Sequence, residues 1–149
     1  MSTLTEHKKK QAAALDTLRL TEAEFQQIIC DIDVAAALRG EVDHGRRNDR
    51  IECHGAGYLT GLLPGERGGF KVLRLRPLDV SVRGVGFLNG RYMYPDTRMM
   101  FVLERVSGGG VRVPGVVRHC THLTRHVHRI GVEFLETVKL DELKLARRG

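Results

Sequence analysis

The sequence predicts a mainly β fold, a six-stranded antiparallel β-barrel flanked by an N-terminal and a C-terminal α-helix. From residue 51 onward, short runs rich in Val, Ile, Leu and Phe alternate with turn signals such as Pro64-Gly65, Asn89-Gly90 and Gly108-Gly109-Gly110. Strands with this spacing and punctuation are typical of an all-β sandwich or barrel, and about 100 residues are enough to close a small barrel. We expect the strands near residues 50–60, 70–76, 78–88, 97–105, 111–121 and 127–135.

Alternation of side chains supports the later strands. Because successive side chains of a strand point to opposite faces, apolar residues two apart mark the face that turns to the core. The residues that we place on such inner faces are Met99, Phe101, Leu103, Ile130, Val132 and Phe134.

Helices are predicted on both sides of the barrel. Thr21 and Glu24 form a capping box at the start of the first helix, and Gly40 stands where that helix would end. Residues 21–39 carry an apolar stripe, which we expect to pack against the barrel or against a second copy of the chain, so a homodimer stays open. Residues 137–147 show apolar residues among charges and predict the second helix, whereas residues 1–20 have no strong period and indicate a tail or a marginal helix.

The composition indicates one globular domain and sets limits on its class. The chain has 149 residues, 42% of them hydrophobic and 28% charged, with a formal net charge of +6. These values are unlike those of a disordered or a membrane-inserted chain, and no apolar run reaches the length of a membrane helix. The three cysteines are widely spaced and odd in number, which favours reduced thiols in the cytoplasm. We divide the chain into a tail and helix (1–40), a barrel (41–136) and a last helix (137–149).

Two polar clusters stand out against this framework. The first is Arg46-Arg47-Asn48-Asp49-Arg50, in the loop before the first strand, and the second is Asp79-Val80-Ser81-Val82-Arg83-Gly84, within a predicted strand. In an extended strand Asp79, Ser81 and Arg83 would point outward while the valines point to the core. Guanidinium groups bind phosphate and guanine, and a carboxylate can accept from the two donors of the guanine Watson–Crick edge. The pair of clusters therefore suits a phosphorylated guanine ligand.

These clusters resemble the paired motifs of the PilZ domain family, whose members bind cyclic di-GMP. The family's RxxxR and [D/N]xSxxG motifs match Arg46 to Arg50 and Asp79 to Gly84, in the same order and on matching elements. Two further segments, Val116-Val117-Arg118-His119-Cys120 and Arg129-Ile130-Gly131-Val132-Glu133-Phe134, look like the last two strands of the family. The resemblance covers about residues 44–136.

The resemblance implies a role for each matching residue. Arg46 and Arg50 would hold phosphates and guanine edges, and Asp79 would meet the Watson–Crick edge of one guanine. Ser81 would bond to a nearby phosphate or base, and Gly84 would leave room for the ligand.

The same resemblance implies a bacterial second-messenger receptor with no catalytic residue, no metal and no cofactor besides its ligand. Arg47 lies between the two motif arginines, where it would add charge or stacking. Because the doubled arginine overlaps the spacer of the motif, both one ligand and a stacked pair of ligands stay open. Ligand contacts would order the loop at 41–50, reposition the helix at 21–39 and signal to a downstream protein that the sequence does not identify.

Other functions have weaker support. A degenerate adaptor of the same fold would bind a protein and no nucleotide, but neither motif is broken here. A small basic barrel that binds nucleic acid nonspecifically is disfavoured, because only 5% of the residues are aromatic and Trp is absent. No triad or phosphate-loop motif points to an enzyme. The histidines His119, His122, His126 and His128, with Cys120, are ligand types that zinc accepts, yet their spacing matches no usual metal pattern and favours a solvated turn.

Overall fold

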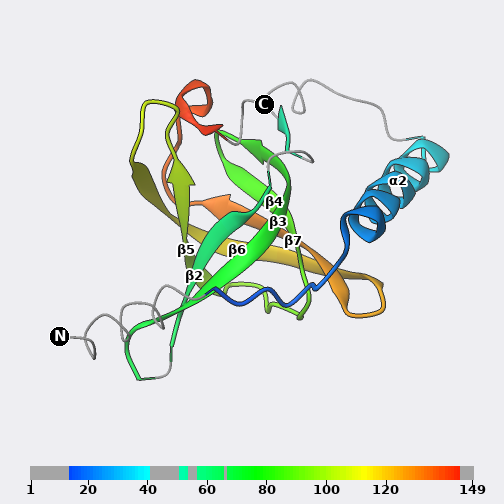
Figure 1. Cartoon of the computed structure of the whole chain (residues 1–149), viewed down its shortest axis with the longest axis horizontal. Coiled ribbons are helices and arrows are strands. Elements are labelled where there is room, and N and C mark those ends of the chain that lie inside the picture. The colour runs from blue at the N-terminus through cyan, green and yellow to red at the C-terminus, as the bar shows by residue number, and fades with distance from the viewer. Residues whose placement is uncertain (1–13, 41–50, 54–56, 66, 145–149) are drawn as a thin grey trace.

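Seven antiparallel strands form one sheet that closes into a barrel (Figure 1). The computed structural model describes residues 14–40, 51–53, 57–65 and 67–144. The strands are β1 (Ile51–Glu52), β2 (Leu59–Pro64), β3 (Phe70–Ser81), β4 (Gly84–Asn89), β5 (Arg98–Glu104), β6 (Gly110–Thr124) and β7 (Val127–Phe134). Their order is β1-β3-β2-β5-β6-β7-β4, and β4 pairs again with β3. The predicted six-stranded antiparallel barrel is confirmed, with β1 as one extra strand.

The barrel interior is filled by the side chains that alternation places inward. Phe101 lies among them. The centroid of its ring is 5.9 Å from that of Phe87 and 6.0 Å from that of Phe134, and both contacts are edge-to-face. Such aromatic pairs add to the free energy that burial of the rings provides. The expected inner faces of β5 and β7 are confirmed, because Met99, Phe101, Leu103, Ile130, Val132 and Phe134 are all buried.

Between residues 70 and 88, the chain reverses at a different residue from the one that the sequence predicts. We expected a break near Pro77, but β3 continues through this proline to Ser81. The register of the β3–β4 pair shifts between Pro77 and Asp79, so a bulge absorbs the residue that cannot donate a ladder hydrogen bond. The reversal comes at Val82 and Arg83, a two-residue hairpin loop between β3 and β4.

The predicted first strand, near 50–60, is likewise two strands. β1 pairs with the end of β3, at Val80 and Asp79, and β2 pairs with the first half of β3. The two short strands therefore share one edge of β3, with Cys53 and Gly57 among the described residues between them.

The first helix is α2 (Glu22–Leu38), and its predicted start and end are confirmed. The Glu24 backbone N–H donates to Thr21 Oγ1 (3.1 Å) and the Thr21 N–H donates to Glu24 Oε1 (2.9 Å). Gly40 takes a positive φ of 70° just after the helix, where glycine has no steric penalty. Among the described residues, no helix has the length and apolar character that crossing a membrane requires.

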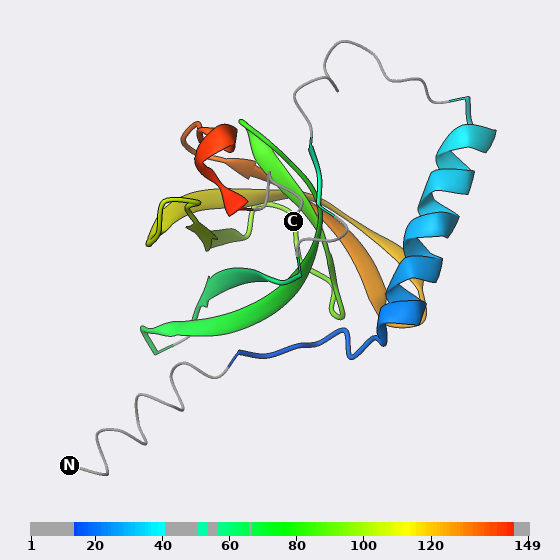
Figure 2. The ribbon, with the colours of Figure 1, turned by 45° about the horizontal axis from the view of Figure 1, so that its top comes forward.

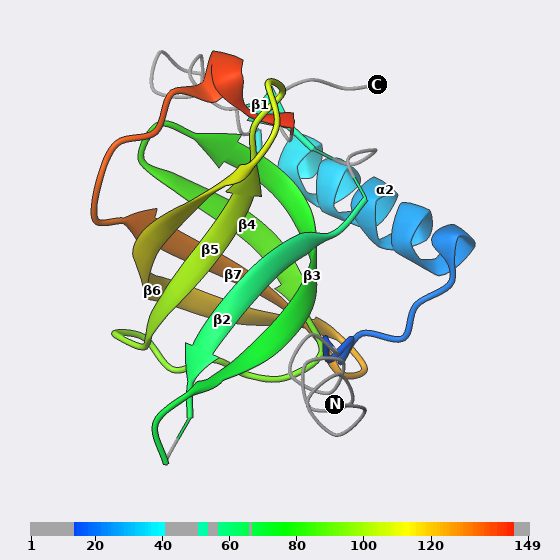
Figure 3. The same ribbon diagram turned by 60° about the vertical axis from the view of Figure 1, so that its left-hand side comes forward.

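Only the first half of α2 packs firmly on the barrel. Figure 2 shows the start of α2 next to the hairpin of β6 and β7, and Figure 3 shows the helix on the outside of the barrel near β3. The second half projects further out, since Val34 is 52% and Leu38 83% exposed. The buried cluster beneath the helix consists of Leu18, Phe25, Ile28, Ile29, Leu78, Leu88 and Val127.

Arg76 on β3 joins this helix to the wall. Its guanidinium carbon lies 3.8 Å from the centroid of the Phe25 ring, and its NH2 group donates to Glu22 Oε2 at 3.0 Å. Arg76 is 7% exposed, and its Nε finds no hydrogen-bond partner in the described part of the chain. A buried cation stacked on an aromatic ring is favourable once water is excluded, so Arg76 contributes to fixing the first turns of α2.

The predicted C-terminal helix at 137–147 is wrong for the residues described. Residues 137–143 contain one 3₁₀ turn, η2 (Leu140–Glu142), and are otherwise without helix. Leu143 is buried and bridges Arg105 in an antiparallel contact. This non-helical path lets Val138, Leu140 and Leu143 all reach the core, which one face of a short helix would not do. Residues 145–147 lie outside the described residues.

We expect Phe25→Ala to cost about 3–4 kcal/mol of stability, because it leaves a cavity and removes the surface on which Arg76 stacks. Urea-induced unfolding, together with amide hydrogen exchange in α2, measures the loss. Val34→Ala on the same helix is the matched control and should change stability by less than about 0.5 kcal/mol. Equal effects of the two substitutions would show that α2 is not anchored through Phe25.

The attachment of α2 should weaken in acid. The hydrogen bond from Arg76 lowers the pKa of Glu22, and the Thr21 backbone N–H lowers the pKa of Glu24. A carboxyl whose pKa is lowered by folding contributes stability above its unfolded pKa, and this contribution is lost as the pH falls through the folded value. The Tm difference between the wild type and the double variant Glu22→Gln/Glu24→Gln should therefore shrink between about pH 5 and about pH 3. A difference independent of pH would contradict this assignment.

Candidate functional site

Asp79 and Ser81 lie on the outer face at the end of β3. Val80 between them is fully buried in the barrel, so alternation turns its two neighbours outward, as predicted. Asp79 is half-buried and pairs with Gly86 on β4. A Cβ atom on Gly86 would come within 3.0 Å of Asp79 Oδ1, so the absence of a side chain there gives the carboxylate its space.

The predicted alternation ends at Ser81, which corrects the expected positions of Val82 and Arg83. Both belong to the hairpin loop, where Val82 is half-buried and Arg83 is exposed. The Arg83 N–H donates to Ser81 Oγ at 3.2 Å, a local turn bond typical of serine. Ser81 itself is only 9% exposed. Its hydroxyl accepts from the loop and keeps its own proton for a further acceptor.

Gly84 has a structural reason to be glycine. A Cβ atom at this position would collide with the backbone carbonyl of Val132 on the neighbouring strand β7. The close approach of β4 and β7 at Gly84 therefore requires a residue without a side chain. Sequence reasoning expected Gly84 to leave room for a ligand, and that expectation is not tested by this contact.

Ser81 and Gly84 border an open cleft of about 440 Å³ on the outer wall. The cleft volume lies within the range of small-molecule sites. β6 and β7 supply groups that the sequence analysis did not single out as site residues. The lining includes Ser81, Gly84, Arg118, His119, Gly131 and Glu133.

Arg83 and the half-exposed Arg118 both line this cleft, and two carboxylates already bind Arg118. Its NH2 group lies 2.8 Å from Glu133 Oε1, and its NH1 group lies 3.4 Å from Asp96 Oδ1. Exposed ion pairs of this kind are weak, so an incoming anion can replace either carboxylate. The sequence does carry a signal for Arg118, because this residue follows an apolar run and precedes His119 on the same predicted strand. The pairing of β6 with β7, which brings Arg118 to Glu133, could not be derived from the sequence.

The four histidines do not form one group. His119 pairs with Gly131, and its ring occupies the space that a side chain at Gly131 would need. His122 Nε2 contacts the Arg125 carbonyl at 2.6 Å, and His128 Nδ1 contacts the His126 carbonyl at 3.0 Å. In the part of the chain that the structure describes, no three or more His, Cys, Asp or Glu side chains are placed to hold a metal ion.

The arginine cluster lies outside the described residues, so the positions of Arg46, Arg47 and Arg50 are not given. The described chain resumes at Ile51, the residue after Arg50. Ile51 pairs with Val80, between Asp79 and Ser81. The first described residue after the arginine segment therefore lies beside the second predicted cluster.

Comparison with known proteins finds no matching family model, no similar curated protein and no similar solved structure.

Replacing Gly84 tests whether the pairing of β4 with β7 requires a residue without a side chain at this position. We expect Gly84→Ala to cost about 1–3 kcal/mol, because β4 and β7 must move apart to admit the methyl group. Gly65→Ala is the matched control, since its added methyl would meet nothing closer than 3.5 Å. Urea unfolding of the two variants measures the difference. Wild-type stability in Gly84→Ala would show that strand pairing does not require this glycine.

Proposed function

We propose that this protein is a receptor for cyclic di-GMP, as the resemblance to PilZ domains implies. The observation that carries the proposal is the pairing of β1 with β3. β1 follows the arginine cluster directly, and Ile51 stands opposite the residue between Asp79 and Ser81. The described strand that follows the first cluster thus pairs with the end of β3 that carries the second cluster, and Ser81 there borders an open cleft.

The chemistry of these groups suits a guanine dinucleotide. Arg46 and Arg50 would bind phosphates and guanine edges through charge-assisted hydrogen bonds. Asp79 would accept from the guanine Watson–Crick edge, while the Ser81 hydroxyl would donate to a phosphate or base. Arg47 would add charge or stacking in the same segment.

Arg118 extends the site into the cleft. A ligand phosphate at Arg118 would take the place of the Glu133 or Asp96 carboxylate. Because an existing ion pair must break, the net gain from this arginine is smaller than that from an arginine without such a partner.

In this proposal binding is a switch and not a reaction. The arginine cluster lies in the segment that connects α2 with β1, so contacts at these arginines act on the end of α2. Ligand-driven ordering of a charged segment is a common switching device. The exposed second half of α2 would then present a changed surface to a downstream protein in the bacterial cytoplasm.

Two rivals remain distinct from this proposal. A PilZ-fold adaptor would bind a protein but no nucleotide. A nonspecific nucleic-acid-binding barrel would lose affinity steeply with salt and would not prefer guanine. Calorimetric titration with cyclic di-GMP, with cyclic di-AMP as the ligand control, separates all three.

We expect guanine-selective binding that Arg50→Ala or Asp79→Ala weakens by roughly 10- to 100-fold, since each removes a charge-assisted contact. Arg118→Ala should weaken binding less, by about threefold to tenfold. The exposed Arg98 on β5 provides the matched control, and Arg98→Ala should bind as the wild type does. The apo proteins should melt at nearly the same temperature. Unchanged affinity in both Arg50→Ala and Asp79→Ala would refute the assignment.

A further inference from the structure

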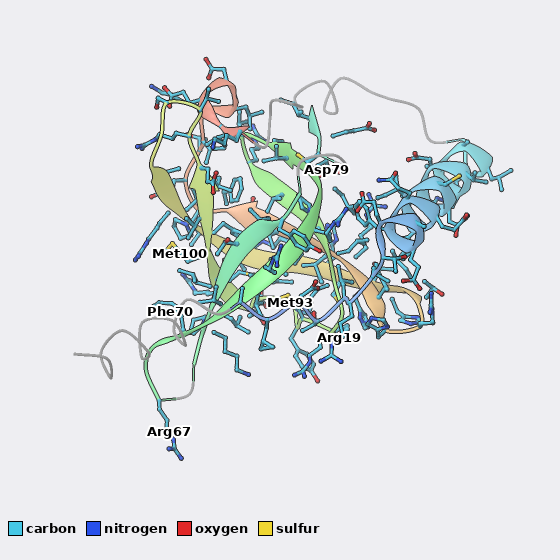
Figure 4. The ribbon with its side chains drawn as sticks, in the orientation of Figure 1. Arg19, Arg67, Phe70, Asp79, Met93 and Met100 are labelled. Carbon is cyan, nitrogen blue, oxygen red and sulfur yellow. The ribbon has the colours of Figure 1, made fainter. Side chains whose placement is uncertain are left out.

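A second open cleft lies at the other end of β4. β4 runs from Gly84, at the first cleft, to Asn89, and six residues of strand span roughly 20 Å. Figure 4 shows Arg19 and Asp79 on opposite sides of the barrel. The second cleft measures about 430 Å³ and is lined by Leu15, Asp16, Thr17, Arg19, Arg91 and His126.

The wall formed by residues 15–19 is held in place from several sides. Leu15 makes two backbone hydrogen bonds with β3, from its N–H to the Val72 carbonyl and from the Arg74 N–H to its own carbonyl, both 2.8 Å long. The Gly90 N–H donates to Thr17 Oγ1 at 2.9 Å. A Cβ atom at Gly90 would collide with the Thr17 carbonyl, so the segment sits directly on the chain after β4. This segment forms no helix, which excludes the marginal helix for residues 14–20.

Asp16 fixes the backbone that presents Arg19. Arg19 has a φ of 51°, a left-handed conformation that costs energy for a residue other than glycine. Asp16 Oδ1 accepts from the N–H groups of Leu18 (3.1 Å) and Arg19 (3.3 Å). Among the described residues that line this cleft, Asp16 is the one carboxylate, and it is committed to the turn.

Two guanidinium groups and an imidazole ring line the cleft from segments that are far apart in the sequence. Arg19 and Arg91 are exposed, and within the described residues neither guanidinium makes an ion pair or a hydrogen bond. Arg76, Arg118 and Arg125 by contrast each bind a carboxylate. His126 donates from Nε2 to the Leu18 carbonyl at 2.6 Å, which fixes its ring against the same wall.

From this arrangement we propose that the second cleft binds the phosphate group of a small phosphorylated molecule. Two guanidinium groups free of carboxylates, placed by a rigid wall, bind a dianion without first breaking an ion pair. Leu15, which is 49% exposed, adds an apolar surface for the rest of the molecule. The site is separate from the proposed cyclic di-GMP site, and neither depends on the other.

Titration of the ¹⁵N-labelled full chain with inorganic pyrophosphate at constant ionic strength tests this proposal. We expect saturable NMR shifts at residues 16–19, at Gly90 and Arg91, and at His126, with a Kd below about 1 mM. Arg19→Asn removes the charge with a residue that tolerates the left-handed backbone, and Arg91→Ala removes the second guanidinium. Each should weaken binding about tenfold.

The matched control is Arg112→Ala, an exposed arginine on β6 away from this cleft, which should bind as the wild type does. Adenosine 5′-diphosphate carries the same diphosphate on a nucleoside. Affinity equal to that of pyrophosphate, or tighter, would support a phosphate site. Shifts that do not saturate, shifts confined to Gly84 and Gly131, or equal weakening in Arg112→Ala would overturn the proposal.

Discussion

The double pairing of β3 is the constraint on which the rest of the structure depends. Its first half pairs with β2, and its second half pairs with β1 on the same edge and with β4 on the other. This arrangement closes the sheet, because a strand with partners on both edges leaves no open side. β3 also carries Asp79 and Ser81 at its end, and Arg76, which holds α2, lies three residues before Asp79 on the same strand.

Glycines shape the outer wall next to this strand. At Gly84 the space is needed by the Val132 carbonyl, at Gly86 by the Asp79 carboxylate, and at Gly131 by the His119 ring. Each glycine admits a group from a neighbouring strand, so polar groups of β3, β6 and β7 approach the sheet surface more closely than side chains would allow. Gly84 and Gly131 both line the first cleft.

Patterns that depend on neighbours in sequence predicted the fold well. The capping box of α2 and the inner faces of β5 and β7 follow from local spacing alone. The continuation of β3 through Pro77 was missed, because the bulge that admits this proline arises only when β3 pairs with β4. The non-helical C-terminal segment was missed, because the contact of Leu143 with Arg105 depends on the folded sheet. For the same reason the sequence located Asp79 and Ser81 on the outer face but missed Arg118 and the second cleft, whose groups come together across strands.

The uneven attachment of α2 has a mechanical consequence. In the first half of the helix Phe25, Ile28 and Ile29 are buried against the barrel, whereas Leu38 at its end is exposed to solvent. Ile29 and Leu38 are roughly 14 Å apart along the helix axis. Because α2 is rigid and is anchored at one end, a rotation of about 20° about Ile29 would displace Leu38 by about 5 Å.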